Sequence, residues 1–169
     1  PSLQTVTISG NTGYAMSQDG AVTFGTMSGI TVSGNTTNGI EVRGSTISTN
    51  TTWKSFSVPL VATNWVSVAG GSSPVLTIQA GVTVKFTSGG ALLIANGGTG
   101  GIAAIGTAAQ PITFTANTNT PVAGYWWGLQ LYARTTAGST IQYASVNYAS
   151  GIQVTGSSPT IDHVTLNTN

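Results

Sequence analysis

The chain has 169 residues and a mass of 17.0 kDa, and 40% of its residues are hydrophobic, which is enough apolar material for one domain with a core. Only 4% of the residues are charged and the formal net charge is +1; the four basic residues are scattered, which argues against a nucleic-acid surface. No apolar run approaches the roughly 18 residues of a membrane-spanning helix, and since cysteine is absent, stability cannot rest on disulfides or thiolate metal sites.

The first predicted strand lies in the segment from Pro1 to Asn11, which reads PSLQTVTISGN. Apolar and polar residues alternate along it, as in a strand with one buried face. The segment ends on an apolar residue, two small polar residues and Asn, and this four-residue unit recurs at 32–35, 47–50 and 166–169. Because Asn tolerates left-handed backbone, we expect bends after strands, some of them left-handed, at Asn11, Asn35, Asn50 and Asn169.

Short alternating stretches continue to the C-terminus, with Gly, Asn, Ser and Pro between them. A second unit recurs as GIEVRGS at 39–45 and GIQVTGS at 151–157, and each copy precedes a Ser/Thr-rich segment and a further strand. No segment has a persuasive helical period over about ten residues. The alternation predicts a set of inward side chains: Val6, Ile8, Val32, Val42, Val84, Ile112, Phe114, Leu131, Ile141, Val154 and Leu166.

Two all-β architectures compete for this pattern. A sandwich or barrel explains short alternating strands, but it does not explain units that recur with the same local pattern. A parallel β-solenoid explains both, because the inward residues of each coil stack on those of the next and stacked Asn side chains can hydrogen-bond along a ladder. With roughly 20–25 residues per coil, the chain makes about seven or eight coils and a rod roughly 35 Å long.

The middle and C-terminal part of the chain carries more specific motifs. In order they are LTI at 76–78, GVTVKF at 81–86, a Gly-rich span, GTAAQPITFT at 106–115, WWGL at 126–129, IQYA at 141–144 and SPTI at 158–161. In this order they resemble a repeat module of long right-handed β-helix proteins of bacterial cell surfaces. The similarity covers most of the chain.

Together with the alternation, the resemblance implies an all-β fold, a right-handed parallel β-helix (β-solenoid) of roughly seven to eight coils. Neither terminus has an amphipathic helix or a charged run, so we expect no clear end caps. It also implies that residues 1–169 form a single module, which is one period of a longer fibre or one subunit of a head-to-tail stack. In that family the modules occur in tandem, and a Pro-Thr-Ile segment leads into Asn-Thr-Gly-Tyr, which here is 11–14.

The two ends of the chain have a common pattern. The C-terminal segment PTIDHVTLNTN, residues 159–169, matches the N-terminal PSLQTVTISGN in its proline, its apolar positions and its final Asn. We therefore expect these segments to occupy equivalent positions in successive coils, so that the last coil of one unit continues into the first coil of the next. The residues expected at this contact are Pro1, Leu3, Val6, Ile8, Ile161, Val164 and Leu166.

The sequence offers little for catalysis. Polysaccharide lyases and hydrolases need grouped carboxylates, or a base beside a cation, whereas Asp19, Glu41 and Asp162 are scattered. Glu41 and Arg43 share one face of a strand and could pair, and we expect an exposed pair between coils there and not a catalytic site. Asp162 and His163 are neighbours, but neighbours on a strand point to opposite faces, so no dyad is expected. We expect no catalytic residue, no metal site and no cofactor, and hence no enzyme.

Two surface features are candidates for carbohydrate. Tyr125, Trp126 and Trp127 could stack on sugar rings, with one Trp inward and the other outward because neighbours alternate. Asn35 and Asn50 each begin an Asn-Thr-Thr sequence, the pattern of N-glycosylation, which also arises by chance in a chain rich in Asn and Thr.

Three functional hypotheses follow. The first is a structural building block of an extracellular filament, sheath or cell-surface stalk, whose partners are copies of itself and which grows through open coils. The second is a carbohydrate-binding or adhesin module on a β-helix scaffold, with surface glycans as partners. The third is a non-catalytic fragment of a polysaccharide-active β-helix enzyme. We expect neither nucleic acid as a partner nor a membrane span.

Overall fold

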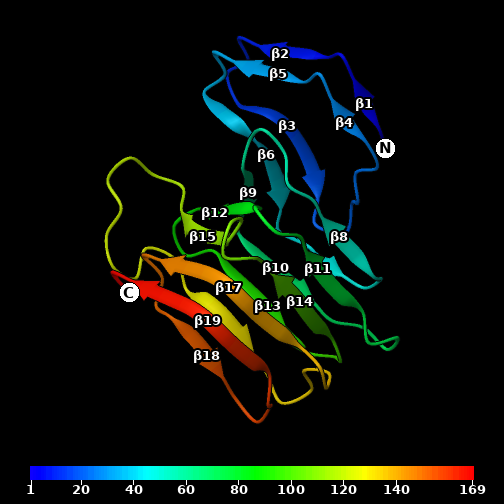
Figure 1. Cartoon of the computed structure of the whole chain (residues 1–169), viewed down its shortest axis with the longest axis vertical. Helices are drawn as coiled ribbons and strands as arrows, with labels where there is room; N and C mark the ends of the chain where they lie inside the picture. The colour runs from blue at the N-terminus through cyan, green and yellow to red at the C-terminus, as the bar shows by residue number, and fades with distance from the viewer.

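The computed structural model describes the whole chain, residues 1–169, and every regular element in it is a β-strand (Figure 1). The strands are β1 (Leu3–Gln4), β2 (Thr7–Ser9), β3 (Tyr14–Asp19), β4 (Met27–Ser28), β5 (Thr31–Ser33), β6 (Thr37–Arg43), β7 (Thr46–Ile47), β8 (Thr51–Trp53), β9 (Leu60–Thr63), β10 (Trp65–Val68), β11 (Val75–Ile78), β12 (Thr83–Phe86), β13 (Ala91–Ile94), β14 (Gly101–Ile105), β15 (Ile112–Ala116), β16 (Gly128–Leu131), β17 (Thr140–Asn147), β18 (Ile152–Val154) and β19 (Thr160–Asn167). All pairs of neighbouring strands are parallel, which excludes an antiparallel sandwich or barrel.

The strands stack in columns, one strand per coil, as in a parallel β-helix. The longest column runs through seven strands, β3-β6-β9-β12-β15-β17-β19, so the chain has seven levels, the lower of the two numbers predicted. A second column is β7-β10-β13-β16-β18, and a third is β8-β11-β14-β17-β19. β17 and β19 belong to two columns because each is a strand of eight residues that bends in its middle.

The first two coils differ from the rest. β1 pairs only with β4, and β2 only with β5, so these two sheets do not continue into the body of the molecule. Among the strands of these two coils, only β6 pairs with a strand of the body, which is β9. The N-terminal strands lie at one end of the molecule in Figure 1. The two copies of the recurring unit, 39–45 and 151–157, do not occupy equivalent positions. The first copy lies in β6 of the longest column, and the second lies in β18, at the end of the second column.

The core is the interior of the coils, where alternate side chains of each strand meet. It contains 28 buried residues, and the rings of Phe86 and Trp126 stack there with their centroids 4.0 Å apart. The predicted inward positions are confirmed as fully buried for Val42, Val84, Ile112, Phe114, Leu131 and Ile141. Val6, Ile8 and Val32 in the first two coils are half-buried.

Two of the predicted inward residues are exposed, namely Val154 at 41% and Leu166 at 48%. Their direction agrees with the prediction, because Val154 pairs in register with buried Leu131, and Leu166 with buried Val146. They are exposed because they belong to the last strands of their columns within residues 1–169.

Candidate functional site

Four segments of the chain have the same bent backbone, and they lie at the two ends of the stack. Each has two left-handed residues five positions apart with a strand between them, and the four form two stacked pairs; the same spacing also occurs at Gly138 and Tyr143 and at Gly151 and Gly156. The pairs are Thr5 and Gly10, Gly29 and Gly34, Tyr143 and Tyr148, and His163 and Thr168. A left-handed residue other than Gly costs conformational energy, so its recurrence at equivalent positions indicates one repeated coil shape. The first and last eleven residues of the chain, 1–11 and 159–169, therefore bend at equivalent positions, although the first form two short strands, β1 and β2, and the last form the single strand β19.

In three of these four segments an Asn follows the second left-handed residue, and its side chain joins neighbouring coils. In the N-terminal pair, Asn35 Nδ2 donates to the carbonyl of Ile8 at 3.0 Å, and Asn35 Oδ1 accepts from the backbone N–H of Asn11 at 3.0 Å. In the C-terminal pair, Asn169 Nδ2 donates to the carbonyl of Val146 at 3.0 Å, and its Oδ1 accepts from the N–H of Ala149 at 2.7 Å. In both cases the Asn of the later coil holds the backbone of the earlier one.

The backbone angles of the four Asn residues differ from the expectation. None of the four has left-handed backbone; the left-handed residue is the one before it, Gly10, Gly34 or Thr168, and Asn50 has no such neighbour. The expectation was wrong because the bend and the hydrogen-bonding side chain are separate residues. The bend turns the chain, and the Asn that follows it can then reach the backbone of the coil before.

The end of the stack formed by β18 and β19 presents apolar side chains. Val154, Ile161 and Leu166 are 41%, 41% and 48% exposed, although their partners in the previous coil are almost fully buried. Val164, on the same strand as Leu166, packs against the core cluster. At the other end, Leu3, Val6 and Ile8 are half-buried and Pro1 is exposed. The residues expected at the assembly contact thus lie on the two terminal coils.

Asp162 and His163 do interact, contrary to the expectation. His163 Nδ1 lies 2.8 Å from Asp162 Oδ1, because the left-handed backbone of His163 interrupts the alternation of side chains. The ring of His163 stacks on the ring of Tyr143, the equivalent left-handed residue of the previous coil, with the two ring centroids 4.5 Å apart. The hydrogen bond from His163, and then that from Gln142 Nε2 at 2.8 Å, hold the pKa of the Asp162 carboxyl below its usual value.

The other charged side chains make contacts between coils on the outer surface. Arg43 pairs with Asp19 at 3.3 Å and not with Glu41, whereas Glu41 accepts hydrogen bonds from Ser17 and Thr63 at 2.6 and 3.1 Å. The expected exposed contact between coils is confirmed, but Arg43 and Glu41 do not pair with each other, because residues directly across the β3–β6 pairing are closer than residues two apart on one strand. Nowhere in the chain do three Asp, Glu or His side chains gather as they would around a metal ion.

The aromatic strand separates its two Trp residues as predicted. Trp126 is fully buried and its Nε1 donates to the carbonyl of Asn147, so the interpretation of Trp126 as a sugar-stacking residue is wrong. Tyr125 is half-buried and packs against the core cluster. Trp127 is 49% exposed, and its ring lies 5.0 Å from that of Trp65, which is 44% exposed.

The local structure explains how these two Trp residues meet across an intervening coil. Trp65 and Trp127 lie two coils apart, and Gly89 and Gly90 stand between them. Trp65 Nε1 donates to the carbonyl of Gly89 at 2.9 Å, and the backbone N–H of Trp127 donates to the carbonyl of Gly90 at 2.8 Å. Any side chain at residue 90 would have to fit beside the carbonyls of Asn64 and Thr87.

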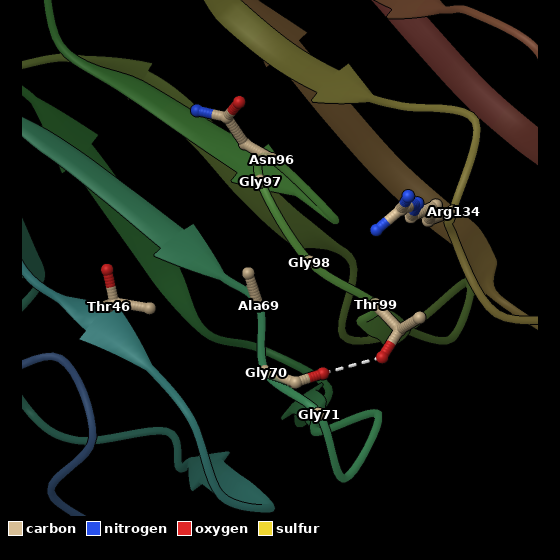
Figure 2. Close-up of a pocket in the computed structure, with 9 residues that line it drawn as sticks. All are labelled: Thr46, Ala69, Gly70, Gly71, Asn96, Gly97, Gly98, Thr99 and Arg134. Carbon is tan, nitrogen blue, oxygen red and sulfur yellow. Dashed lines mark hydrogen bonds between the residues drawn. The ribbon is translucent and has the colours of Figure 1, made fainter.

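Trp65, one residue of the Trp pair, lines a groove on the outer face of the second column. A hollow of about 410 Å³ begins at Trp65 and is lined by Asn64, Ser67 and Asn96 among others. A second hollow, of about 520 Å³, shares Asn96 with it and extends to Arg134. Figure 2 shows the Arg134 guanidinium pointing toward the Gly97–Gly98 segment, and Thr99 bonded to the carbonyl of Gly70. We call the whole the Trp65–Arg134 groove.

The structure also places the two candidate glycosylation residues. Asn35 is buried, and its Nδ2, the atom that would carry a glycan, donates to carbonyls of Ile8 and Ser33. Asn50 is exposed, and it uses Oδ1 to accept from the N–H of Val75, which leaves its nitrogen toward solvent. Of the two, only Asn50 presents a free side-chain nitrogen at the surface.

Sequence reasoning missed Trp65 and Arg134. Trp65 lies 62 positions before Trp127, and nothing in their spacing predicts that the two rings meet. The only local signal was the Gly89-Gly90 pair, since two glycines beside a strand indicate that something packs closely there.

Comparison with known proteins adds a family-level result. The family model described as a pectate-lyase-like β-helix domain matches residues 45–167, which is 123 of the 169 residues. The match begins just before β7 and leaves out the first two coils, which are also the ones that depart from the regular columns. No curated protein and no solved structure matches the chain significantly. The structure contains no helix that could cross a membrane.

Proposed function

This chain belongs to the family of pectate-lyase-like β-helix domains, and we propose that it serves as a structural building block of an extracellular filament, sheath or surface stalk. In this proposal the units assemble end to end through their terminal coils. The observation that carries it is the common conformation of residues 1–11 and 159–169, with left-handed residues at equivalent positions. A coil that already stacks on its equivalent within the chain has the shape needed to stack on its equivalent in a second copy.

The apolar residues of the last coil provide a driving force. Covering Val154, Ile161 and Leu166 would remove three side chains from water that are 41–48% exposed. Since fully burying one such side chain is worth about 1.5–3 kcal/mol, half-burying three contributes on the order of 3 kcal/mol before the cost of association. Unpaired backbone groups at the edge of β19 would gain partners at the same time.

The low charge of the chain suits dense packing. With four basic and three acidic residues, lateral repulsion between units is weak, and the contact should depend little on salt. The proposed location, outside the cell or on its surface, rests on the resemblance to surface β-helix proteins. A contact between unlike ends does not close on itself, so it produces an open filament when its rotation does not close a ring.

The experiment is a concentration series of the purified chain, followed by sedimentation velocity and electron microscopy. We expect rods of constant width whose length grows with concentration, at low and at high salt alike. A single 17.0 kDa species at all concentrations would contradict the proposal.

We also propose that the chain is not an enzyme. The three carboxylates lie in different coils, and each is engaged with a neighbour: Asp19 with Arg43, Glu41 with Ser17 and Thr63, and Asp162 with His163 and Gln142. Incubation with polygalacturonate and with neutral polysaccharides should release no reducing ends and no unsaturated sugars. Release of either would favour the third hypothesis, in which the chain derives from a polysaccharide-active enzyme.

A second candidate function, carbohydrate binding, is favoured by the Trp65–Arg134 groove. Trp65 and Trp127 offer exposed ring faces at one end, and amide, hydroxyl and guanidinium groups line the rest. Such a combination of aromatic surface and polar groups is typical of sites that hold sugars. A glycan array should then give signals that Trp127→Ala abolishes and Val122→Ala, at an exposed apolar residue elsewhere, leaves unchanged. An array without signals would remove this candidate.

A further inference from the structure

The two ends of the chain carry matching halves of the Asn contact that joins coils inside it. Where two bent coils are neighbours, the side chain of Asn35 hydrogen-bonds to the backbone of Ile8 and Asn11. The side chain of Asn169 does the same to the backbone of Val146 and Ala149. In both cases the Asn bonds to a carbonyl and to the N–H three residues later. The last coil has the same two backbone groups, the carbonyl of Leu166 and the N–H of Asn169, and no Asn side chain within residues 1–169 bonds to them.

Asn11 is the side chain that could take this place. It follows left-handed Gly10 as Asn35 follows Gly34 and Asn169 follows Thr168. Its Nδ2 donates to Asn35 Oδ1 at 2.7 Å, which uses one of its two hydrogens, while its Oδ1 has no partner within the chain. Asn11 thus has one donor hydrogen and one acceptor oxygen left, which is the set that Asn35 and Asn169 use toward the preceding coil.

We infer that residues 1–11 of a second copy pair with the free edge of β19 in one register, with Leu3 opposite Ile161, Thr7 opposite Thr165 and Ile8 opposite Leu166. In this arrangement the Nδ2 of Asn11 donates to the carbonyl of Leu166 across the junction, and its Oδ1 accepts from the N–H of Asn169. The inference rests on the proposed end-to-end assembly and adds the partner segment, the register and the polarity of the contact.

The bends exclude other registers. In both existing pairs the left-handed residues face each other across the coils: the pairing of β17 with β19 passes over Tyr143 and His163, and Gly29 lies against Thr5. A shift by one residue would turn the apolar side chains outward. A shift by two would keep the apolar side inward, but it would place left-handed residues opposite extended ones, so the strands would separate at both bends.

The same register makes the apolar contact continuous. Leu3, Val6 and Ile8 would lie over Ile161, Val164 and Leu166, as Met27, Ile30 and Val32 lie beside Leu3, Val6 and Ile8 within the chain. Because the strands must run parallel and the two ends differ, only head-to-tail contact satisfies both the Asn and the apolar residues. The absence of cysteine allows the register to be tested with single introduced pairs.

The test is disulfide cross-linking of three double variants under mild oxidation. Thr7→Cys with Thr165→Cys places the two Cys opposite each other at about the 4.8 Å strand spacing, which a disulfide can bridge. Thr7→Cys with Asn167→Cys reports a shift by two, and Thr7→Cys with Thr160→Cys is a control on the same exposed face of β19. We expect a ladder of covalent oligomers from the first pair, formed at least tenfold faster than from the other two.

The outcomes separate the register from the assembly. Oligomers that form without preference for the first pair, or that cross-link through Asn167→Cys, would overturn the register and leave end-to-end assembly standing. Absence of any oligomer of the unmodified chain would overturn both. As a second readout, Asn11→Ala should raise the concentration needed for assembly about tenfold, whereas Asn119→Ala, on an exposed loop residue, should not. Equal behaviour of the two variants would remove Asn11 from the contact.

Discussion

At the scale of single residues, left-handed backbone decides where the coils turn and which side chains meet. Glycine accepts this conformation without strain, whereas Thr5, Tyr143 and His163 adopt it inside a repeated bend. The bend at His163 also brings its imidazole to Asp162, although adjacent residues on a regular strand would point apart. The chemistry of a pair of neighbours therefore depends on one backbone angle.

Gly128, directly after the two Trp residues, is the position where a side chain is tolerated least. It has a φ of +93°, and a Cβ at this position would lie 1.9 Å from the carbonyl oxygen of Gly151 in the next coil. Gly128→Ala should lower the free energy of unfolding by about 3 kcal/mol, because it adds both backbone strain and a clash. The measurement is chemical denaturation. Gly71→Ala, where a Cβ meets nothing within 4 Å, is the control, and equal losses for the two variants would contradict this explanation.

Asp162 gives a prediction about pH. His163 chiefly, and Gln142 in second place, hold its pKa below the usual value, so the folded chain binds this proton less readily than the unfolded chain does. The resulting stabilisation is present above the unfolded pKa of about 3.9 and is lost as the pH falls through the lower folded pKa. An NMR titration should place the Asp162 pKa below its ordinary range.

The two contributions can be separated with single variants. His163→Ala should raise the pKa of Asp162 more than Gln142→Ala does, because the hydrogen bond from His163 is the larger cause. The reverse order would show that the contact with His163 is not formed in solution.

At the scale of elements, the first two coils have one strand pairing with the body, between β6 and β9, and are otherwise held to it by contacts of the segment 20–25 such as Phe24 in the core. β1, β2, β4 and β5 pair only among themselves, and β6 alone continues into the long column. Asn35, in the second coil, ties the two coils to each other by bonding to the carbonyl of Ile8 and the N–H of Asn11 in the first. Elements with few buried contacts open first, so the strands before β6 should be the least protected part of the chain.

Substitution of Asn35 tests this arrangement. Asn35→Val removes the acceptor of the Asn11 N–H and the donor to the Ile8 carbonyl, and it should destabilise the first two coils by about 1–3 kcal/mol through groups left without partners. Hydrogen exchange should become faster in residues 1–35 and remain unchanged in β11 to β16. Asn119→Val, which replaces an exposed Asn with no such bonds, is the control. Uniformly faster exchange along the whole chain would mean that the two coils do not open separately.

At the scale of the whole molecule, the main feature is a stack whose two terminal coils have the same shape. The interior side chains Ile141 and Val146 are fully buried, whereas Ile161 and Leu166, which follow them in the same columns, are 41% and 48% exposed. The difference is one of position in the stack and not of chemistry. Any process that adds a further coil would bury them.

Leu166 therefore separates folding from assembly. Leu166→Asp should leave the unfolding transition of the isolated chain nearly unchanged, because the side chain already contacts water, but it should raise the concentration for filament growth at least tenfold, since the junction would bury an unpaired charge. Thr165→Asp carries the same charge on the outer face of the strand and should have a much smaller effect. Growth of Leu166→Asp filaments at the wild-type concentration would rule out burial of this residue at a junction.

The sequence by itself determined the coil and its interior. Period-two alternation depends only on the geometry of a strand, so the inward direction of residues such as Val84, Phe114 and Leu131 could be predicted without knowing their neighbours. The opposite directions of Trp126 and Trp127 follow from the same rule. The match between the two ends of the chain also holds in three dimensions, because the same short pattern produces the same pair of bends.

Only the tertiary structure decided which coils lie beside each other and which residues they bring together. Trp65 and Trp127 lie two coils apart, and Gly89 and Gly90 in the coil between them have no side chains that would separate the rings, whose centroids are 5.0 Å apart. This arrangement depends on the length of every loop between the two residues. The burial of Val146 and the exposure of Leu166 likewise depend on whether another coil follows. Local sequence determines the direction of a side chain, whereas its environment depends on the number and length of the coils stacked around it.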